Sequence, residues 1–377
     1  ATRPGRLKRN MPRAPAGARP PAPLRGPAVN AKRSAPAAGP ATADRRQFLE
    51  TSLAGLTAAA LPVWATPKAH ALQSSPKSIS ETAVKAFFDS LTPDQKKVVC
   101  FAWGHTDDQR GLLRTHVSNN WQVTRPTIDS PFFSPTQRGL LYDVFKGLFQ
   151  PDWVKKIEKQ LKDDSGGRPW GAAQSVAVFG TPGADKFQLV MTGRHLTIRA
   201  DGNSEDHVAL GGPIFHGHAA EGFVEKAHHP GNVFWHQALE ANKVFTMLDG
   251  KQRKAALVAE RPPEEEVPFR GDMPHPGLPI REMSPDQREQ VAKTLAALVE
   301  PYRDEDRREI MACLDKNGGL ERCSLAFYKD GDIGNDGVWD NWRLEGPAFV
   351  WYFRGEPHVH IWVHVADVST VMLNSKG

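Results

Sequence analysis

The residues best able to do chemistry lie near the C-terminus, where histidines occupy alternate positions. They are His358, His360 and His364, with Trp362 between the last two, and Val359, Ile361, Val363 and Val365 fill the gaps. Because an extended strand sends successive side chains to opposite faces, the three imidazoles are expected to share one face. Alternate strand positions are about 6.5 to 7 Å apart, so neighbouring imidazoles can converge on one metal ion. The alternative is the solvated polar face of an edge strand.

The first 71 residues are interpreted as a leader that is removed. Arg45-Arg46 precedes an uncharged Ala- and Leu-rich stretch, 51–65, and the small-residue motif Ala69-His70-Ala71, which together are typical of a twin-arginine signal. The Pro-, Ala- and Arg-rich segment before it is predicted to be disordered. The apolar stretch is shorter than the roughly 20 residues of a membrane span. We therefore expect a periplasmic or secreted protein that uses the twin-arginine export machinery and keeps no stable membrane span.

Removing the leader reverses the net charge. Residues 1–71 hold 12 Lys and Arg but only 2 Asp and Glu, whereas the whole chain has a net charge of +5. The remaining 306 residues hold 36 basic and 41 acidic residues, a net charge of −5. This composition lacks the basic footprint of nucleic-acid binding, so no nucleic-acid partner is expected.

Helical and strand patterns occupy separate stretches of the mature chain. Apolar residues at helical spacing, and Ser-Pro or Thr-Pro starts followed by Gln, predict helices within 78–165 and 232–316. Short apolar runs between Gly-containing turns predict strands within 175–215 and 323–366. The predicted fold class is α+β, with a mainly antiparallel sheet flanked by segregated helical blocks. We expect one domain, 72–377, in which both strand blocks pair into a single sheet.

The cysteines narrow the kind of metal site. Cys313 and Cys323 are able to pair in an oxidising compartment, which leaves Cys100 over, and no C-x-x-C motif is present. Any metal is therefore expected to be held by nitrogen and oxygen atoms.

Several short motifs, taken in order, resemble the exported bacterial proteins grouped as the domain of unknown function 3500 family. They are Phe179-Gly180-Thr181-Pro182-Gly183, Gly193-Arg194-His195-Leu196, Gly212-Pro213-Ile214-Phe215, Leu344-Glu345-Gly346-Pro347 and His358-Val359-His360. The resemblance runs from about Ser80 to Val365 and implies no particular activity. The family usually shows paired histidines before the second strand, whereas this chain has Arg194 and then His195. His364 and the segment His216-Gly217-His218 also depart from the family pattern.

The sharpest hypothesis joins His195 to His358 and His360 on adjacent antiparallel strands. Three imidazole nitrogens with an open fourth position would let a divalent ion, Cu, Zn or Fe, activate a bound water or support redox chemistry. The alternative is that His195 caps a turn while the other two histidines form hydrogen bonds within a polar sheet face.

Four further residues are candidates for roles at this site. His216 and His364 are candidate additional metal ligands, because His216 lies two residues from His218 and His364 is expected on the same strand face as His358 and His360. His218 and Glu356 are candidate catalytic proton carriers; Glu356 lies in a predicted hairpin turn, where a glutamate is also unremarkable.

Other functional motifs are absent from the sequence. It has no G-x-S-x-G, H-E-x-x-H, P-loop or strand-linked G-x-G-x-x-G motif. The aspartate-rich segment from Asp330 has Asn335 and Asn341 where an EF-hand loop needs Gly and Glu. Two hypotheses remain: an exported metal-dependent enzyme, hydrolytic or oxidative, acting on a small molecule, or a periplasmic metal- or ligand-binding protein without catalysis.

Overall fold

The computed structural model describes residues 78–225, 229, 231–265 and 267–371. The expected leader and export signal lie outside the described residues. The α-helices are α1 Ile79–Ser90, α2 Pro93–Val99, α3 Pro135–Gly147, α4 Pro151–Asp164, α5 Trp235–Met247, α6 Gly250–Ala256, α7 Pro285–Val299 and α8 Asp304–Lys316. The strands are β1 Cys100–Phe101, β2 Thr106–Asp107, β3 Gly111–Leu112, β4 Ser175–Gly180, β5 Phe187–Gly193, β6 Leu196–Ala200, β7 Ile214–His218, β8 Leu257–Val258, β9 Leu278–Pro279, β10 Ser324–Tyr328, β11 Asn341–Gly346, β12 Phe349–Arg354 and β13 Val359–Val365.

Three helices begin where the cap motifs predict. Thr92, Ser134 and Ser284 precede α2, α3 and α7, and each forms a capping box with the Gln three positions later. In a capping box the two side chains satisfy main-chain N–H groups that the first helical turn leaves unpaired. Pro at the first helical position adds a preset backbone angle, so these starts are specified locally.

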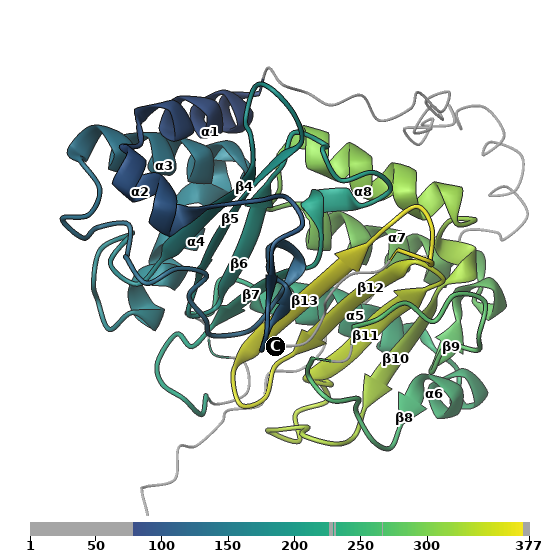
Figure 1. The fold of residues 1–377 in the computed structure, drawn as a ribbon. Coiled ribbons are helices and arrows are strands. Elements are labelled where there is room, and N and C mark those ends of the chain that lie inside the picture. Colours follow the sequence, from purple (N-terminus) through teal and green to yellow (C-terminus); the bar gives the residue numbers. More distant parts are fainter. Residues whose placement is uncertain (1–77, 226–228, 230, 266, 372–377) are drawn as a thin grey trace, which may run out of the picture. The chain divides into compact units, whose positions relative to one another are not determined.

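Strands from both blocks form one sheet. Within the described residues it has 11 strands, in the order β1-β4-β5-β6-β7-β13-β12-β11-β10-β8, with β9 paired to β10 (Figure 1). The two blocks meet where β7 runs antiparallel to β13, with His360 opposite Gly217. The prediction that both strand blocks pair into one sheet is therefore confirmed.

The fold is mixed α/β and its large sheet is mostly antiparallel, but two finer predictions need correction. The sheet is mixed, because β1 runs parallel to β4 and β8 runs parallel to β10. The expected segregation of the helical blocks is not confirmed, since short strands lie inside both of them. The parallel strands β1 and β8 each have two residues and directly follow α2 and α6. Two residues are too few to show the alternation of apolar and polar residues that predicts a strand.

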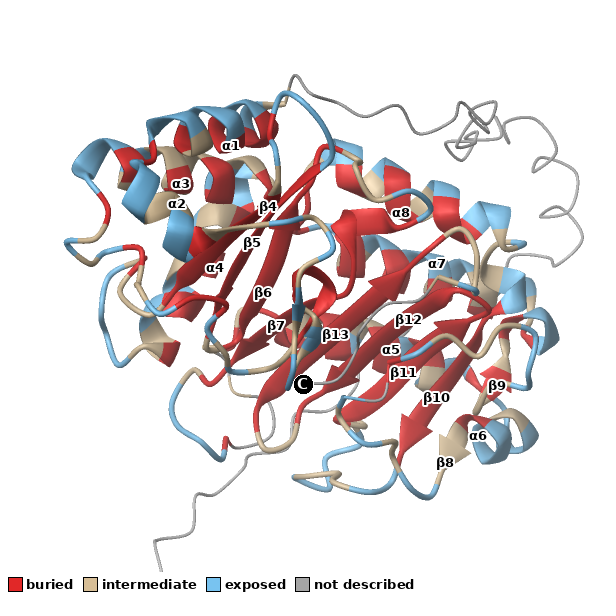
Figure 2. Cartoon of the chain, viewed as in Figure 1, coloured by how far each residue is buried: buried red, intermediate tan, exposed pale blue. Residues whose placement is uncertain are grey.

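The two faces of the sheet are covered differently. On one face Ile361 of β13 belongs to the main apolar cluster with helical residues such as Leu295. On the other face Trp362 clusters with Val117 and Val267, which come from connecting loops. Figure 2 shows that the long strands are buried along their length. The face that carries the C-terminal histidines is thus the loop-covered face.

The described residues contain no disulfide bond and no helix that could span a membrane. Cys313 and Cys323 are buried and unlinked, and Cys100 is half-buried and also free. None of the described helices has both the length and the apolar character that a membrane crossing requires.

Candidate metal centre

Three histidines from distant parts of the chain converge at one point. His195 lies in the turn between β5 and β6, His358 directly precedes β13, and His360 is the second residue of β13. Their Nε2 atoms are 3.1 Å apart for His195 and His358, 3.2 Å for His195 and His360, and 2.9 Å for His358 and His360. The structure therefore brings together the three residues of the sharpest sequence hypothesis, which we call the triad.

The spacing of the triad fits one ion. For a metal about 2.0 to 2.1 Å from each nitrogen, tetrahedral ligands are about 3.3 to 3.4 Å apart and ligands at right angles about 2.8 to 3.0 Å apart. The observed separations of 2.9 to 3.2 Å lie between these limits. A single ion can thus contact all three nitrogens with small ring movements.

Two of the rings are oriented through their outer nitrogens. His358 Nδ1 lies 2.6 Å from the main-chain oxygen of Phe223, and His360 Nδ1 contacts Glu264 Oε1. Because both partners only accept hydrogen bonds, Nδ1 must carry the proton in each ring. Each Nε2 then presents its lone pair to the centre of the triad, as metal-binding histidines do.

His195 is oriented by the C-terminal end of α4. Its Nδ1 is 2.9 Å from Asp164 Oδ1, although this contact is not aligned as a hydrogen bond. The same oxygen accepts a hydrogen bond from the main-chain N–H of Ala219 at 2.9 Å, and Gln160 Nε2 donates to Asp164 Oδ2 at 2.9 Å. Asp164 is therefore a fixed carboxylate behind the third ring.

The backbone at His195 adopts an unusual conformation that its neighbours hold in place. Its φ is +57°, a region that residues with a side chain rarely adopt. His195 N donates to Asn119 O at 2.8 Å, and its carbonyl accepts from Gly217 N at 3.3 Å and Gln160 Nε2 at 3.2 Å. A Cβ on Gly217 would lie 3.0 Å from the His195 ring, so a glycine there leaves the ring its space. Such strained, over-determined residues cluster at functional sites.

Glu264, which lies in a loop, links the triad to other polar side chains on the loop-covered face of the sheet. Besides His360, its carboxylate accepts hydrogen bonds from Trp362 Nε1 at 3.3 Å and Asn119 Nδ2 at 3.4 Å, and it pairs with Arg354. Burial alone would raise the pKa of Glu264, but the contacts with His360 and Arg354 lower it to about 2. Glu264 is thus ionised. Its negative charge lies behind the His360 ring, where it would increase the basicity of His360 Nε2 towards a bound ion.

The triad is buried, and burial holds two of its rings, His358 and His360, neutral. His195, His358 and His360 are 4%, 2% and 6% exposed. Burial, followed by the neighbouring His360, lowers the pKa of His358 to about 4, and burial lowers the pKa of His360 despite the opposing effect of Glu264. Near pH 7 both rings are therefore unprotonated and able to act as ligands.

The predicted ligand His216 lies on the opposite face of the sheet. It precedes Gly217 on β7, so its ring points among Phe149, Phe234 and Tyr302, with ring centroids 5.8 to 5.9 Å away. Neither ring nitrogen has a hydrogen-bond partner in the described part of the chain, and burial lowers the pKa of His216 to about 3. His216 does not join the triad.

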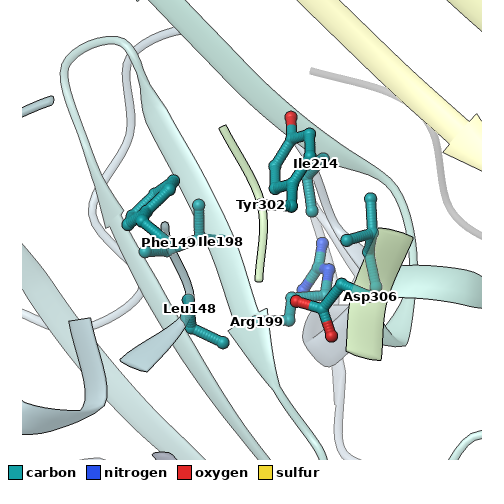
Figure 3. A pocket seen from close by; sticks show the side chains of 8 residues that line it. Leu148, Phe149, Ile198, Arg199, Ile214, Tyr302 and Asp306 are labelled. Atoms are coloured by element: carbon teal, nitrogen blue, oxygen red, sulfur yellow. The ribbon is translucent and has the colours of Figure 1, made fainter. Parts of the chain in front are cut away.

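A small cavity lies on this same helix-covered side. Figure 3 shows Phe149, Tyr302, Ile198 and Ile214 among the side chains that line it. Because Ile198 and Ile214 belong to the helix-side apolar cluster, this cavity is separated from the triad by the sheet.

His218, predicted as a proton carrier, also points away from the triad. Its Nδ1 accepts a hydrogen bond from Val233 N at 3.1 Å, so its Nε2 carries the proton and donates to Asp163 Oδ2 at 3.0 Å. Both ring nitrogens are occupied, and the side chain is fully buried. The ring holds α4 and the segment before α5 against β7.

His364 and Glu356 share the region of the triad but not its centre. His364 Nδ1 lies 2.9 Å from Val267 O, and its ring stacks on Phe269 at 3.9 Å. The Glu356 carboxylate pairs with Arg261 Nη1 at 2.7 Å. The structure therefore gives each of these two side chains a different partner.

Sequence reasoning missed all three groups behind the triad. Asp164 ends a helix, Glu264 lies in a Pro- and Glu-rich loop between several similar residues, and Phe223 contributes only its main-chain oxygen. No local pattern marks any of them. The one available signal was the general rule that a metal-binding histidine needs an acceptor behind it.

Comparison with known proteins gave one match. A family model with the description "Protein of unknown function (DUF3500)" matches residues 73–366. Comparisons with curated proteins and with solved structures found no match. The matched range includes the whole triad and the three groups behind it.

Proposed function

The chain belongs to this DUF3500 family, and we propose that it is a metal-dependent enzyme whose triad binds one divalent ion. In this proposal His195, His358 and His360 supply three Nε2 ligands, and Asp164, Phe223 O and Glu264 orient the rings. A fourth position on the ion is left for water or substrate. Glu356 and His218 are not part of the proposed centre, because other partners hold them.

One observation carries the proposal. Three Nε2 atoms converge within 2.9 to 3.2 Å of one another, and outer acceptors keep the protons of His358 and His360 on the far side of each ring. The inward lone pairs of His358 and His360, whose Nε2 atoms are 2.9 Å apart, repel each other unless a cation lies close to both. Burial also lowers the pKa values of His358 and His360, so neither ring supplies that positive charge by protonation near pH 7.

The donor set favours zinc or copper. Imidazole suits Zn, Cu, Fe and Ni, whereas the non-haem iron oxygenases use two histidines and a carboxylate. The nearby carboxylates of Asp164 and Glu264 contact outer nitrogens and are not directed at the centre of the triad. A zinc ion with three histidines and an open position lowers the pKa of bound water to about 7, so hydrolysis is the first reaction to test and copper-dependent oxidation the second.

Burial supports a second candidate, which is metal binding without turnover. With exposures of 2% to 6%, the three rings leave little surface through which a substrate would reach the ion. Slow release of the metal and no turnover of any substrate would favour this function.

We also propose export by the twin-arginine route. Its support is the sequence of residues 45–71, with paired arginines, a short apolar stretch and a small-residue cleavage motif. That route carries folded proteins, which suits a protein whose metal site joins distant segments. N-terminal sequencing of the exported protein tests it and is expected to begin at Leu72.

The metal site is tested by elemental analysis of purified protein after loading with Zn²⁺ or Cu²⁺. We expect one ion per chain in the wild type and large losses in H358A and H360A. His364→Ala is the matched control, because His364 lies on the same strand and face but outside the triad. Full occupancy in both triad variants would reject the site.

The enzymatic part is tested separately with the zinc-loaded and copper-loaded protein. Zinc-dependent hydrolysis of chromogenic esters or phosphoesters that H360A lacks would support the enzyme. Oxidation of phenolic substrates with dissolved O2 as the electron acceptor, seen with the copper form alone, would assign redox chemistry. A fully loaded protein that turns over neither class would leave metal binding as the function.

A further inference from the structure

A second cluster of ionisable groups lies in the connection between β10 and β11, outside the triad. It contains Asp330, Asp332, Asp336 and Asp340. Asp330 is paired, because its Oδ2 lies 3.3 Å from Arg261 Nε. Asp332 and Asp340 form no ion pair with a Lys, Arg or His of the described residues.

Asp340 is the unusual member of this cluster. It is 0% exposed, and its Oδ2 accepts a hydrogen bond from Ile333 N at 2.7 Å. Its Oδ1 has no hydrogen-bond partner among the described residues, although it is buried. A buried acceptor without a partner costs free energy, more so when it is ionised.

The unpartnered oxygen belongs to a carboxyl that faces another carboxyl. The side chains of Asp332 and Asp340 lie within hydrogen-bonding reach of each other, and Asp340 N donates to Asp332 Oδ1 at 3.4 Å. Burial raises the pKa of Asp340 to about 7, and the nearby charges of Asp332 and Asp336 add to the rise. Two carboxylates in contact need either a shared proton or a cation.

We propose that this connection is a calcium site in which Asp332 and Asp340 are the first ligands. Ca²⁺ takes six to eight oxygen ligands in flexible geometry, so main-chain oxygens, waters and the side chains of Asn335 or Asp336 can complete its shell. An oxygen-only donor set selects Ca²⁺ over the zinc or copper that suits the triad.

A cavity beside Asp332 has room for water molecules around a bound ion. A cavity of about 290 Å³ is lined by Asp332, Asn335 and Gly337. Arg253 also lines this cavity, but its Nη2 donates to Thr246 O at 2.7 Å. The cavity therefore offers room for waters beside Asp332 without displacing the core.

A bound ion here would stabilise the turn that leads to the triad. Gly355 N donates to Asp340 O at 2.8 Å, and a Cβ on Gly355 would lie 2.9 Å from that oxygen. Arg261 bridges Asp330 to Glu356 in the same turn. Because His358 follows within three residues, calcium at Asp332 and Asp340 would fix the approach of β13 to the metal centre.

The test is thermal unfolding of the full chain, treated with EDTA and then dialysed, with and without about 5 mM Ca²⁺, a level that fills weak extracellular-type sites. Ca²⁺ is expected to raise the Tm of the wild type by about 3 °C or more. D332N and D340N should lose this rise, whereas the matched variant D330N should keep it. The same concentration of Mg²⁺ controls for general charge screening.

Two outcomes would overturn the calcium site. One is a wild-type Tm that Ca²⁺ raises no more than Mg²⁺ does, which would assign a shared proton to the two carboxyls. The other is a calcium-induced rise that survives in both D332N and D340N. The H358A variant separates the two centres, because it should keep the response to Ca²⁺ while losing the zinc ion.

Discussion

Two histidine pairs with the same spacing lie on neighbouring strands and have different surroundings. His358 and His360, around the start of β13, face the loop-covered side, where His195, Glu264 and a main-chain oxygen meet them. His216 and His218 of β7 face the helix-covered side. There the His216 ring lies among aromatic side chains, and the His218 ring forms hydrogen bonds with a main-chain N–H group and a carboxylate.

The difference shows what strand spacing does and does not specify. Alternate histidines share a face on either strand, but the pairing register decides which face. Because Gly217 lies opposite His360, the residue on β7 that faces the triad is a glycine, and both β7 histidines point the other way. A metal site therefore needs acceptors behind the rings as well as the correct spacing of the histidines.

The largest expected effect comes from removing His195, the triad member in the turn between β5 and β6. H195A should lower the affinity for Zn²⁺ by about 100-fold or more. Removing a residue that only orients a ligand costs about 10- to 100-fold in metal affinity, and removing a ligand itself should cost more. H216A, the control from the other face, should bind as the wild type does. Competition with a chromogenic chelator measures both, and equal losses in the two variants would contradict the comparison.

The next effect concerns the carboxylate behind His360. E264A should weaken zinc binding by about 10- to 100-fold, because His360 loses its outer acceptor. Glu356→Ala is the matched control, because that carboxylate pairs with Arg261 instead. The same chelator competition applies, and unchanged affinity in E264A would show that the outer contact does not tune the ion.

The buried His216, on the helix-covered face of the sheet, is expected to make the stability depend on pH. Burial lowers the pKa of His216 to about 3, against about 6.5 in the unfolded chain, so below pH 6.5 the unfolded state binds a proton that the folded state does not. Its contribution to the free energy of unfolding is therefore complete above pH 6.5 and falls by about 1.4 kcal/mol per pH unit towards pH 4. H216L should flatten this dependence in urea unfolding of metal-free protein, and an unaltered slope would place the titration elsewhere.

The smallest expected effect tests the glycine between the two β7 histidines. A Cβ at position 217 would lie 2.8 Å from Val359 O and 3.0 Å from the His195 ring, so G217A should displace that ring and weaken zinc binding a few-fold. Gly139→Ala is the control, because nothing lies within 4 Å of its Cβ position. Calorimetric titration resolves such a difference, and equal affinities in both variants would show that the ring has room to adjust.

Local patterns predicted much of the fold. The capped helix starts at Thr92, Ser134 and Ser284 and the alternation along β13 were readable because each is set by neighbours in sequence. The two-residue parallel strands β1 and β8 could not be predicted, because they are defined only by their pairing with β4 and β10. The strand β11 lies within the predicted strand block 323–366, but the burial of its polar residues Asn341, Arg343 and Glu345 could not be predicted from the sequence.

The candidate site was readable only in part. The three triad histidines were named from spacing and family resemblance, whereas His216 and His364 were included because spacing alone does not assign a face or a partner. Glu264 and Asp164 became visible only when the chain was folded, because their contacts span 96 and 31 residues.

Diffraction at the zinc absorption edge, from crystals of the zinc-loaded chain, tests the central claim most directly. The account predicts one anomalous peak about 2.0 to 2.1 Å from the Nε2 atoms of His195, His358 and His360, with one further non-protein ligand. A peak beside His216 or His218, or zinc-loaded crystals without a peak among the three rings, would contradict it.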